Sequence, residues 1–205
     1  MVSSRKSSAI RESSSSGKRR ALSQQVTPMP QHLQDVKETA DEISHLNTPD
    51  NPVTTQLQRQ VANALMLFIN YKHYHWQVYG PQFRDLHLLF DEFAAEMLET
   101  FDEFAERLRM IGQDPVFSLD QVKKTATVEA AKGGHESLRQ MLEEADRNMI
   151  LTIKELRDAN EAAEEANDPG TIDLIGKSVR VAEKQEWYFR EMLKSGDTRL
   201  GPKSR

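Results

Sequence analysis

Histidine and carboxylate side chains that could bind a metal ion recur along one predicted helix. His87 and Asp91 are four residues apart, and so are Asp102 and Glu106. At 100° per residue, all four lie within about 100° of one another on the helix surface. Two acids four residues apart repel each other, and a bound cation would remove that repulsion. A solvated polar face would also explain the acids, so this spacing alone leaves both interpretations open.

The two pairs are too far apart to bind one ion within a single chain. Asp91 and Asp102 are eleven residues apart, which is about 16 Å along a helix, whereas metal–ligand bonds are about 2 Å long. If two copies cross antiparallel near the middle of the helix, the His87–Asp91 pair of one copy meets the acidic pair of the other. The pattern therefore predicts two equivalent sites in a symmetric dimer. One nitrogen with several carboxylates favours iron or manganese.

A further histidine lies near the end of the preceding helical segment. His75 comes five residues before the Gly80-Pro81 turn, so it should pack close to the start of the next helix. His73 and His75 are about 200° apart on a helix and cannot share one face. A histidine beside a tryptophan, here Trp76, is more often structural than a ligand, so these residues alone do not decide.

Four long helical segments must position these side chains. Glycine and proline bound them and predict helices over residues 54–78, 83–111, 135–166 and 171–194. The connection over 112–134 is long, with a short helix predicted at either 119–123 or 128–132. Apolar residues at helical spacing also predict a short helix over 31–46. Because no alternating strand pattern appears, we expect an all-α four-helix bundle with one long crossover.

The composition excludes several classes of protein and divides the chain into three parts. The 205 residues contain no cysteine, which excludes a disulfide scaffold, a thiolate zinc site and a cysteine nucleophile. The formal charge of −5 conceals an acidic body, because the first 20 residues hold six bases and one acid. We expect a disordered, basic, serine-rich tail over 1–50 that includes the short helix. A bundle over 51–194 and a basic tail over 195–205 follow.

With the adjacent tryptophan, the ligand-type residues resemble a known pattern. His75-Trp76 is followed by His87, Asp91, Asp102 and Glu106 at spacings of 12, 4, 11 and 4. This resembles the ferroxidase pattern of the Dps miniferritins, DNA-binding proteins from starved cells, and the resemblance covers roughly residues 54–194. It implies that His75, His87 and Asp91 come from one subunit, and Asp102 and Glu106 from its two-fold mate.

The resemblance also implies an assembly and an activity. The assembly is a hollow dodecamer of ferritin-like bundles. Its iron site at the dimer interface, with two metals or mixed occupancy, oxidises Fe(II), preferentially with hydrogen peroxide, and ferric mineral is stored inside. Trp76 would then be a sink for stray oxidising equivalents, or simply a packed core residue. By the same resemblance Asp173 and Asp168 would line iron-entry pores, although a solvated acidic turn is the rival interpretation.

The two tails carry further hypotheses. Bases in the first 20 residues could bind DNA through its phosphates without reading sequence, or only keep the chain soluble; these are Arg5, Lys6, Arg11, Lys18, Arg19 and Arg20. The segment that precedes the bundle contains four residues that could form an extra metal site, although no motif supports it; these are His32, Asp35, His45 and Asp50.

The function predicted is therefore an iron-sequestering ferroxidase that protects DNA, located in the cytoplasm and associated with the nucleoid. The alternative is a DNA-compacting nucleoid protein with little ferroxidase activity. An intrasubunit di-iron ferritin would need Glu-x-x-His motifs on bundle helices. The only such motif here, Glu42–His45, lies outside the bundle.

Overall fold

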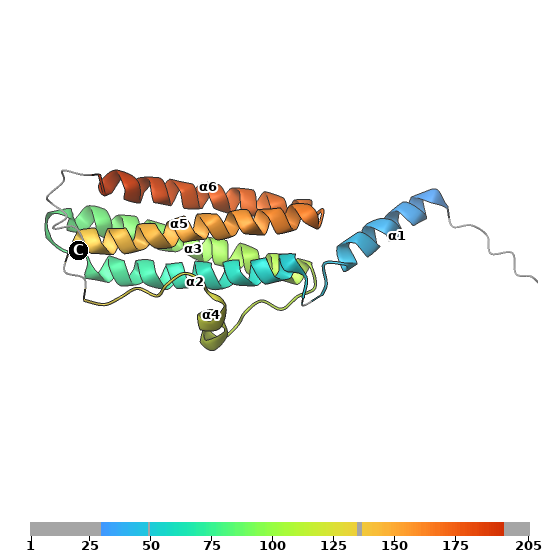
Figure 1. Cartoon of the computed structure of the whole chain (residues 1–205), viewed down its shortest axis with the longest axis horizontal. Helices are drawn as coiled ribbons and strands as arrows, with labels where there is room; N and C mark the ends of the chain where they lie inside the picture. The colour runs from blue at the N-terminus through green and yellow to red at the C-terminus, as the bar shows by residue number, and fades with distance from the viewer. Residues whose placement is uncertain (1–29, 49, 135–136, 195–205) are drawn as a thin grey trace, which may run out of the picture.

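The computed structural model describes residues 30–48, 50–134 and 137–194, and in this part of the chain the regular elements are all helices. Four long helices lie side by side along the long axis of the molecule (Figure 1), which confirms the four-helix bundle: α2 (Pro52–Gln77), α3 (Phe83–Met110), α5 (Leu138–Glu165) and α6 (Pro169–Met192). A 3₁₀ turn, η1 (Gly80–Gln82), joins α2 to α3, and α4 (Leu119–Thr125) lies in the crossover. Among the described residues, no helix is both long and apolar enough to cross a membrane.

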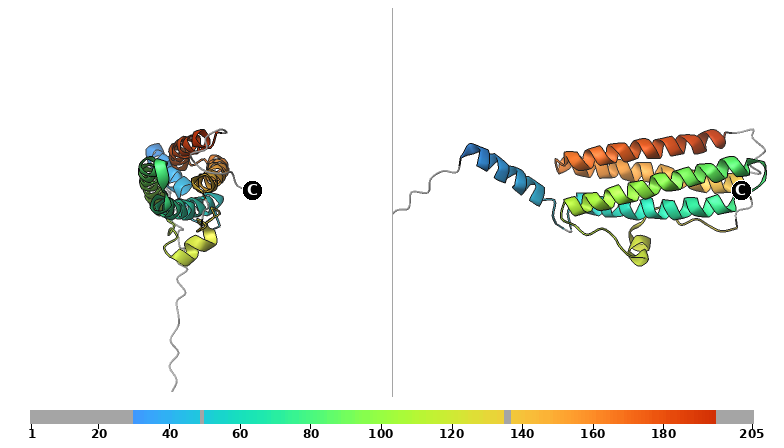
Figure 2. Two further views of the ribbon diagram at one scale, coloured as in Figure 1. Left: turned by 90° about the vertical axis from the view of Figure 1, so that its left-hand side faces the viewer. Right: turned by 180° about the vertical axis from the view of Figure 1, so that it is seen from behind.

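The short helix before the bundle is α1 (Gln31–Ser44), close to the predicted span of 31–46. It projects past the end of the bundle instead of packing along it (Figures 1 and 2). Two of its apolar side chains, Leu33 and Val36, are exposed. Residues 1–29 and 195–205, with the predicted DNA-binding bases of the N-terminal tail, lie outside the described residues.

Two helices begin earlier than the sequence pattern predicts, in both cases at a proline. The side chain of Asn51 accepts a hydrogen bond from the N–H of Val53 at 2.8 Å, and Pro52 is the first residue of α2. Asp168 caps Pro169 and α6 in the same way. Proline fits the first turn because the N–H it lacks would have no partner inside the helix. Proline therefore starts these helices two residues before their predicted beginnings.

Aromatic side chains fill the core near one end of the bundle. Five of them are fully buried and in ring contact: Tyr71, Tyr74, Phe90, Phe93 and Phe189. The two buried hydroxyls are satisfied differently, since Tyr71 donates to the amide oxygen of Gln185 at 2.9 Å and Tyr74 donates to the carboxylate of Glu144 at 2.7 Å. Burial raises the pKa of both phenols. Both tyrosines are therefore protonated throughout the physiological range.

Three asparagines hold the crossover against the bundle. Asn63 of α2 accepts the N–H of Thr127 at 2.8 Å and donates to its hydroxyl at 3.0 Å. Asn70 donates to the carbonyl of Glu129 at 2.8 Å and accepts from Ala131 at 2.7 Å. Asn148 of α5 bonds both backbone groups of Glu129. This segment is therefore extended and fixed by side chains, and the short helix forms at 119–125 instead of at 128–132.

Candidate metal centre

His75 and His87 face each other where the end of α2 meets the start of α3. Their rings stack with centroids 3.6 Å apart and an interplanar angle of 21°. Nδ1 of His75 lies 2.7 Å from the carbonyl oxygen of His87, and Nδ1 of His87 lies 2.8 Å from that of His75. Because a carbonyl oxygen only accepts, each Nδ1 carries the hydrogen. Each Nε2 therefore keeps the lone pair that a metal ion requires, with the ring fixed by its other nitrogen.

Asp91 lies on α3 one turn after His87, and its carboxylate is exposed. It accepts a hydrogen bond from the ammonium of Lys72, one turn before His75 on α2, at 2.6 Å. That ammonium holds the pKa of the Asp91 carboxyl below its usual range. We call His75, His87 and Asp91 the histidine half-site.

Two contacts of the histidine half-site were missed by sequence reasoning. Phe83 stacks with the His87 ring with centroids 5.0 Å apart, and Lys72 forms an ion pair with Asp91. Helical spacing offered a signal for both, because Phe83 lies four residues before His87 and Lys72 three residues before His75. Each residue supports a ligand side chain by packing or by charge.

Asp102 and Glu106 form the acidic half-site, on the same helix but well beyond the histidines. Both side chains are exposed, and Asp102 borders a surface hollow with Ala95 and Leu98. Within the described part of the chain, no three histidine or carboxylate residues gather closely enough to hold a metal ion. One chain therefore does not bring the five predicted ligands together.

Apolar side chains lie on the same face of α3 as the ligands. Leu88 is 51% exposed and Leu98 is 47% exposed, and both lie within about 100° of His87 around the helix. Trp76, beside His75, is 67% exposed, so it is not a core residue within one chain. Covering these side chains with another protein would remove their apolar surface from water.

The two aspartates predicted to line a pore differ in their surroundings. Asp168 is only 3% exposed, and it pairs with the guanidinium of Arg107 at 2.5 Å. Its carboxylate also accepts from the hydroxyl of Thr171 at 2.6 Å and caps the N-terminus of α6. Asp173, one turn further along α6, is exposed. Asp168 thus holds α3 to α6, and of the two aspartates it is Asp173 whose carboxylate is open to solvent.

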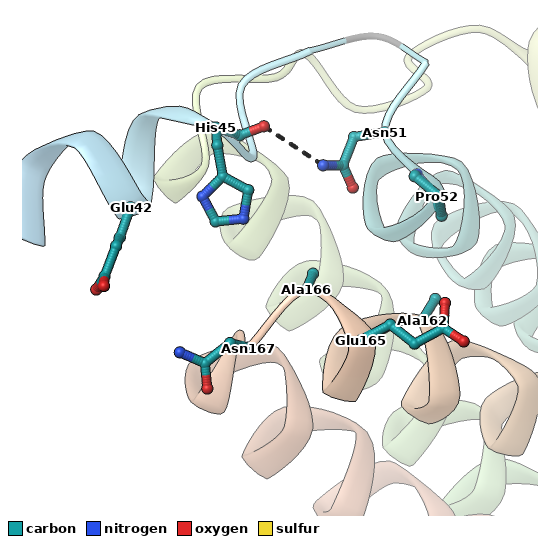
Figure 3. Close-up of a pocket in the computed structure, with 8 residues that line it drawn as sticks. All are labelled: Glu42, His45, Asn51, Pro52, Ala162, Glu165, Ala166 and Asn167. Atoms are coloured by element: carbon teal, nitrogen blue, oxygen red, sulfur yellow. Dashed lines mark hydrogen bonds between the residues drawn. The ribbon is translucent and has the colours of Figure 1, made fainter.

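The extra metal site predicted before the bundle is not assembled in the described residues. His45 borders an open pocket of about 540 Å³ between α1 and the α5–α6 turn (Figure 3), which is also lined by Glu42, Glu165 and Asn167. Its imidazole points into that pocket, and its backbone carbonyl accepts from Asn51 at 3.4 Å. His32, Asp35 and Asp50 do not line this pocket.

Comparisons with known proteins identify the family of this chain. A family model described as the ferritin-like domain matches residues 54–198. DNA protection during starvation protein 1 of Deinococcus radiodurans is 33% identical over 141 residues, which are 69% of this chain and 68% of that protein. The Dps structure from Thermosynechococcus elongatus is 43% identical with a TM-score of 0.70, covering 75% of this chain and 98% of that one.

The description of a less similar structure names the superfamily to which that protein belongs. The Dps protein of Vibrio cholerae is 25% identical with a TM-score of 0.66 over 75% of this chain and 92% of that one. It is described as a member of a broad superfamily of ferritin-like diiron-carboxylate proteins. The family model matches residues 54–198, a range within which all five half-site residues lie. The chain therefore belongs to the ferritin-like family and, within it, to the Dps miniferritins.

Proposed function

We propose that this protein is a ferroxidase that takes up Fe(II), oxidises it with hydrogen peroxide or oxygen at sites shared between two subunits, and stores the ferric product inside a dodecameric cage. The observation that carries the proposal is the division of one helix face into two incomplete half-sites. The family supports it, since a relative is described as a ferritin-like diiron-carboxylate protein.

A symmetric dimer would complete both half-sites at once. If two α3 helices cross antiparallel near their middle, the histidine half-site of each subunit faces the acidic half-site of the other. The same crossing would cover the exposed Leu88 and Leu98 on that face. Burying these side chains would favour the dimer by roughly 25 cal/mol for each Å² of apolar surface removed from water.

In the assembled site each residue would have a distinct role. The Nε2 atoms of His75 and His87 would donate lone pairs to Fe(II), with the rings held by their Nδ1 hydrogen bonds. The carboxylates of Asp91, Asp102 and Glu106 would offset the charge of the bound iron, which increases on oxidation. On binding iron, the carboxylate of Asp91 would release the ammonium of Lys72. Two Fe(II) ions held together supply both electrons that one peroxide requires, so no hydroxyl radical is released.

Iron must reach the inside of such a cage. Residues 21–193 hold 17 bases and 30 acids, and an acidic body attracts cations. The exposed carboxylate of Asp173 is the proposed pore residue, because that of Asp168 is bound to Arg107.

The half-site division can be tested by mixing two inactive chains. One variant carries His75→Ala and His87→Ala, and the other carries Asp102→Ala and Glu106→Ala. Each variant assembled alone should be inactive, whereas co-expression should restore about a quarter of the wild-type sites, since half of the random dimers contain one complete site. The rate of Fe(II) oxidation is followed by ferric absorbance, with far-UV circular dichroism as the folding control. A mixture as inactive as its parents would contradict a shared site.

Protection of DNA by direct binding is the second candidate function. The relative from Deinococcus radiodurans is named a DNA protection protein, and the first 20 residues here are strongly basic. We propose that this tail binds DNA phosphates beyond the acidic shell, consistent with a cytoplasmic, nucleoid-associated protein. Deleting residues 1–20 should abolish gel retardation of DNA at low salt and leave iron oxidation intact. Retardation that survives the deletion would exclude the tail as the DNA-binding element.

A further inference from the structure

A buried tyrosine–carboxylate pair lies in the core at the end of α2 that carries His75. Tyr74 precedes His75 in α2, and its ring packs against Phe90, which lies three residues after His87 in α3, with centroids 5.3 Å apart. The Tyr74 hydroxyl donates to Oε1 of Glu144 at 2.7 Å. The Glu144 side chain is itself buried in α5. The core therefore places an oxidisable phenol, with a carboxylate beside it, one residue from His75 in α2 and in contact with α3 one turn after His87.

The neighbouring buried tyrosine provides a contrast. Tyr71 is as deeply buried as Tyr74, and the two ring centroids are 6.4 Å apart. Its hydroxyl, however, donates to the amide oxygen of Gln185 at 2.9 Å. A phenol loses an electron readily only when its proton leaves at the same time, and a carboxylate accepts that proton where an amide does not. Of the two tyrosines, only Tyr74 thus has a base positioned for oxidation.

We propose that Tyr74 is a one-electron donor that quenches stray oxidising equivalents from the iron site, with Glu144 as its proton acceptor. The proposal rests on the ferroxidase function proposed above. When only one Fe(II) ion is bound, it supplies only one of the two electrons that peroxide requires, and a one-electron oxidant of the hydroxyl-radical class results. Tyr74 supplies the missing electron.

The step balances in atoms and charge. The O–H bond of Tyr74 breaks, its proton moves to Oε1 of Glu144, and its electron reduces the hydroxyl radical to hydroxide. The products are a neutral tyrosyl radical and a neutral glutamic acid side chain. A later Fe(II) ion returns the electron and Glu144 returns the proton. Because Tyr74 is fully buried, its radical is kept from solvent, whereas one on Trp76 would be exposed in a single chain.

The experiment uses the assembled full-length protein with one Fe(II) ion per site and excess hydrogen peroxide, frozen within milliseconds for electron paramagnetic resonance. We expect a tyrosyl signal whose lines narrow when the protein contains ring-deuterated tyrosine. Tyr74→Phe should lower that signal about ten-fold, and Glu144→Gln should do the same because it keeps the shape but removes the base. A purely packing role for Glu144 would leave the radical yield unchanged.

Tyr71→Phe is the matched control, since it removes a buried hydroxyl of the same core and should leave the signal unchanged. Circular dichroism and the mass of the assembly confirm that each variant folds. A signal retained in Tyr74→Phe or in Glu144→Gln would overturn the inference, and so would a wild type that oxidises iron yet forms no tyrosyl radical. A wild type that does not oxidise Fe(II) would overturn the proposed function and the inference with it.

Discussion

The two halves of α3 hold their ligand residues in different ways. At the N-terminal end the ligand side chains are bonded within the chain, because His87 is locked against His75 and Asp91 is bound to Lys72. At the C-terminal end the helix backbone is anchored instead, since Arg107 pairs with Asp168 of α6. The side chains of Asp102 and Glu106 project freely, and no side chain in the described part of the chain bonds to either.

This difference indicates which half of the proposed site exists before assembly. The histidine half-site has its rings oriented and its charge neutralised in a single chain. The acidic half-site carries two carboxylates one turn apart, which repel each other until a cation arrives. The histidine half-site is therefore pre-organised for the proposed iron site. The acidic half-site would bind iron only together with the histidine half-site of the partner subunit.

Removing a histidine should have the largest effect on activity. His87→Ala deletes one Nε2 ligand and the ring on which His75 stacks, so Fe(II) oxidation should slow by about 100-fold or more. His45→Ala, which removes a histidine outside the bundle, is the control and should leave the rate unchanged. Equal rates in the two variants, measured by ferric absorbance, would show that the ring pair has no part in oxidation.

Removing Asp168, which anchors the C-terminal half of α3 through Arg107, should mainly reduce stability. Asp168→Ala leaves the Arg107 guanidinium without its buried partner and removes the cap of α6. We expect a loss of about 2–4 kcal/mol in the free energy of unfolding. Asp173→Ala, an exposed acid on the same helix, should cost less than about 0.5 kcal/mol. Denaturant unfolding compares the two variants, and similar midpoints would contradict a structural role for Asp168.

The smallest effect is expected at Lys72. Lys72→Met removes the cation that competes with iron for Asp91, so Fe(II) affinity should rise by about three-fold at low salt, and the gain should shrink as salt screens the pair. Lys154→Met breaks an exposed pair with Asp158 on α5 and serves as the control. Calorimetric titration with Fe(II) under anaerobic conditions measures both. Weaker binding in Lys72→Met would mean that the lysine orients Asp91 for the metal.

Much of this architecture could be predicted from periodicity and spacing. The four long helices were predicted because their apolar stripes and their glycine and proline boundaries are strong local signals. The positions of His87, Asp91, Asp102 and Glu106 on one helix also predicted two separated half-sites. Sequence spacing alone can predict these features, because they depend on residues close together along the chain.

Other features depend on contacts across the fold and could not be predicted in that way. The stacking of His75 on His87 requires the exact course of the turn at η1. The burial of Asp168 depends on Arg107, which is 61 residues away in the chain. The sequence marks Asp168 as one more acid in an acidic turn, and only the packing of α3 on α6 distinguishes it from Asp173.

The asparagine contacts of the crossover limit how this loop can vary in length. Each amide offers a donor and an acceptor together, so Asn63, Asn70 and Asn148 pair with the extended segment much as a neighbouring β-strand would. Inserting or deleting one residue between Thr127 and Ala131 would shift the pairings on one side of the change out of register with those on the other. This segment lacks regular secondary structure, yet we expect it to tolerate changes in length less well than most surface loops.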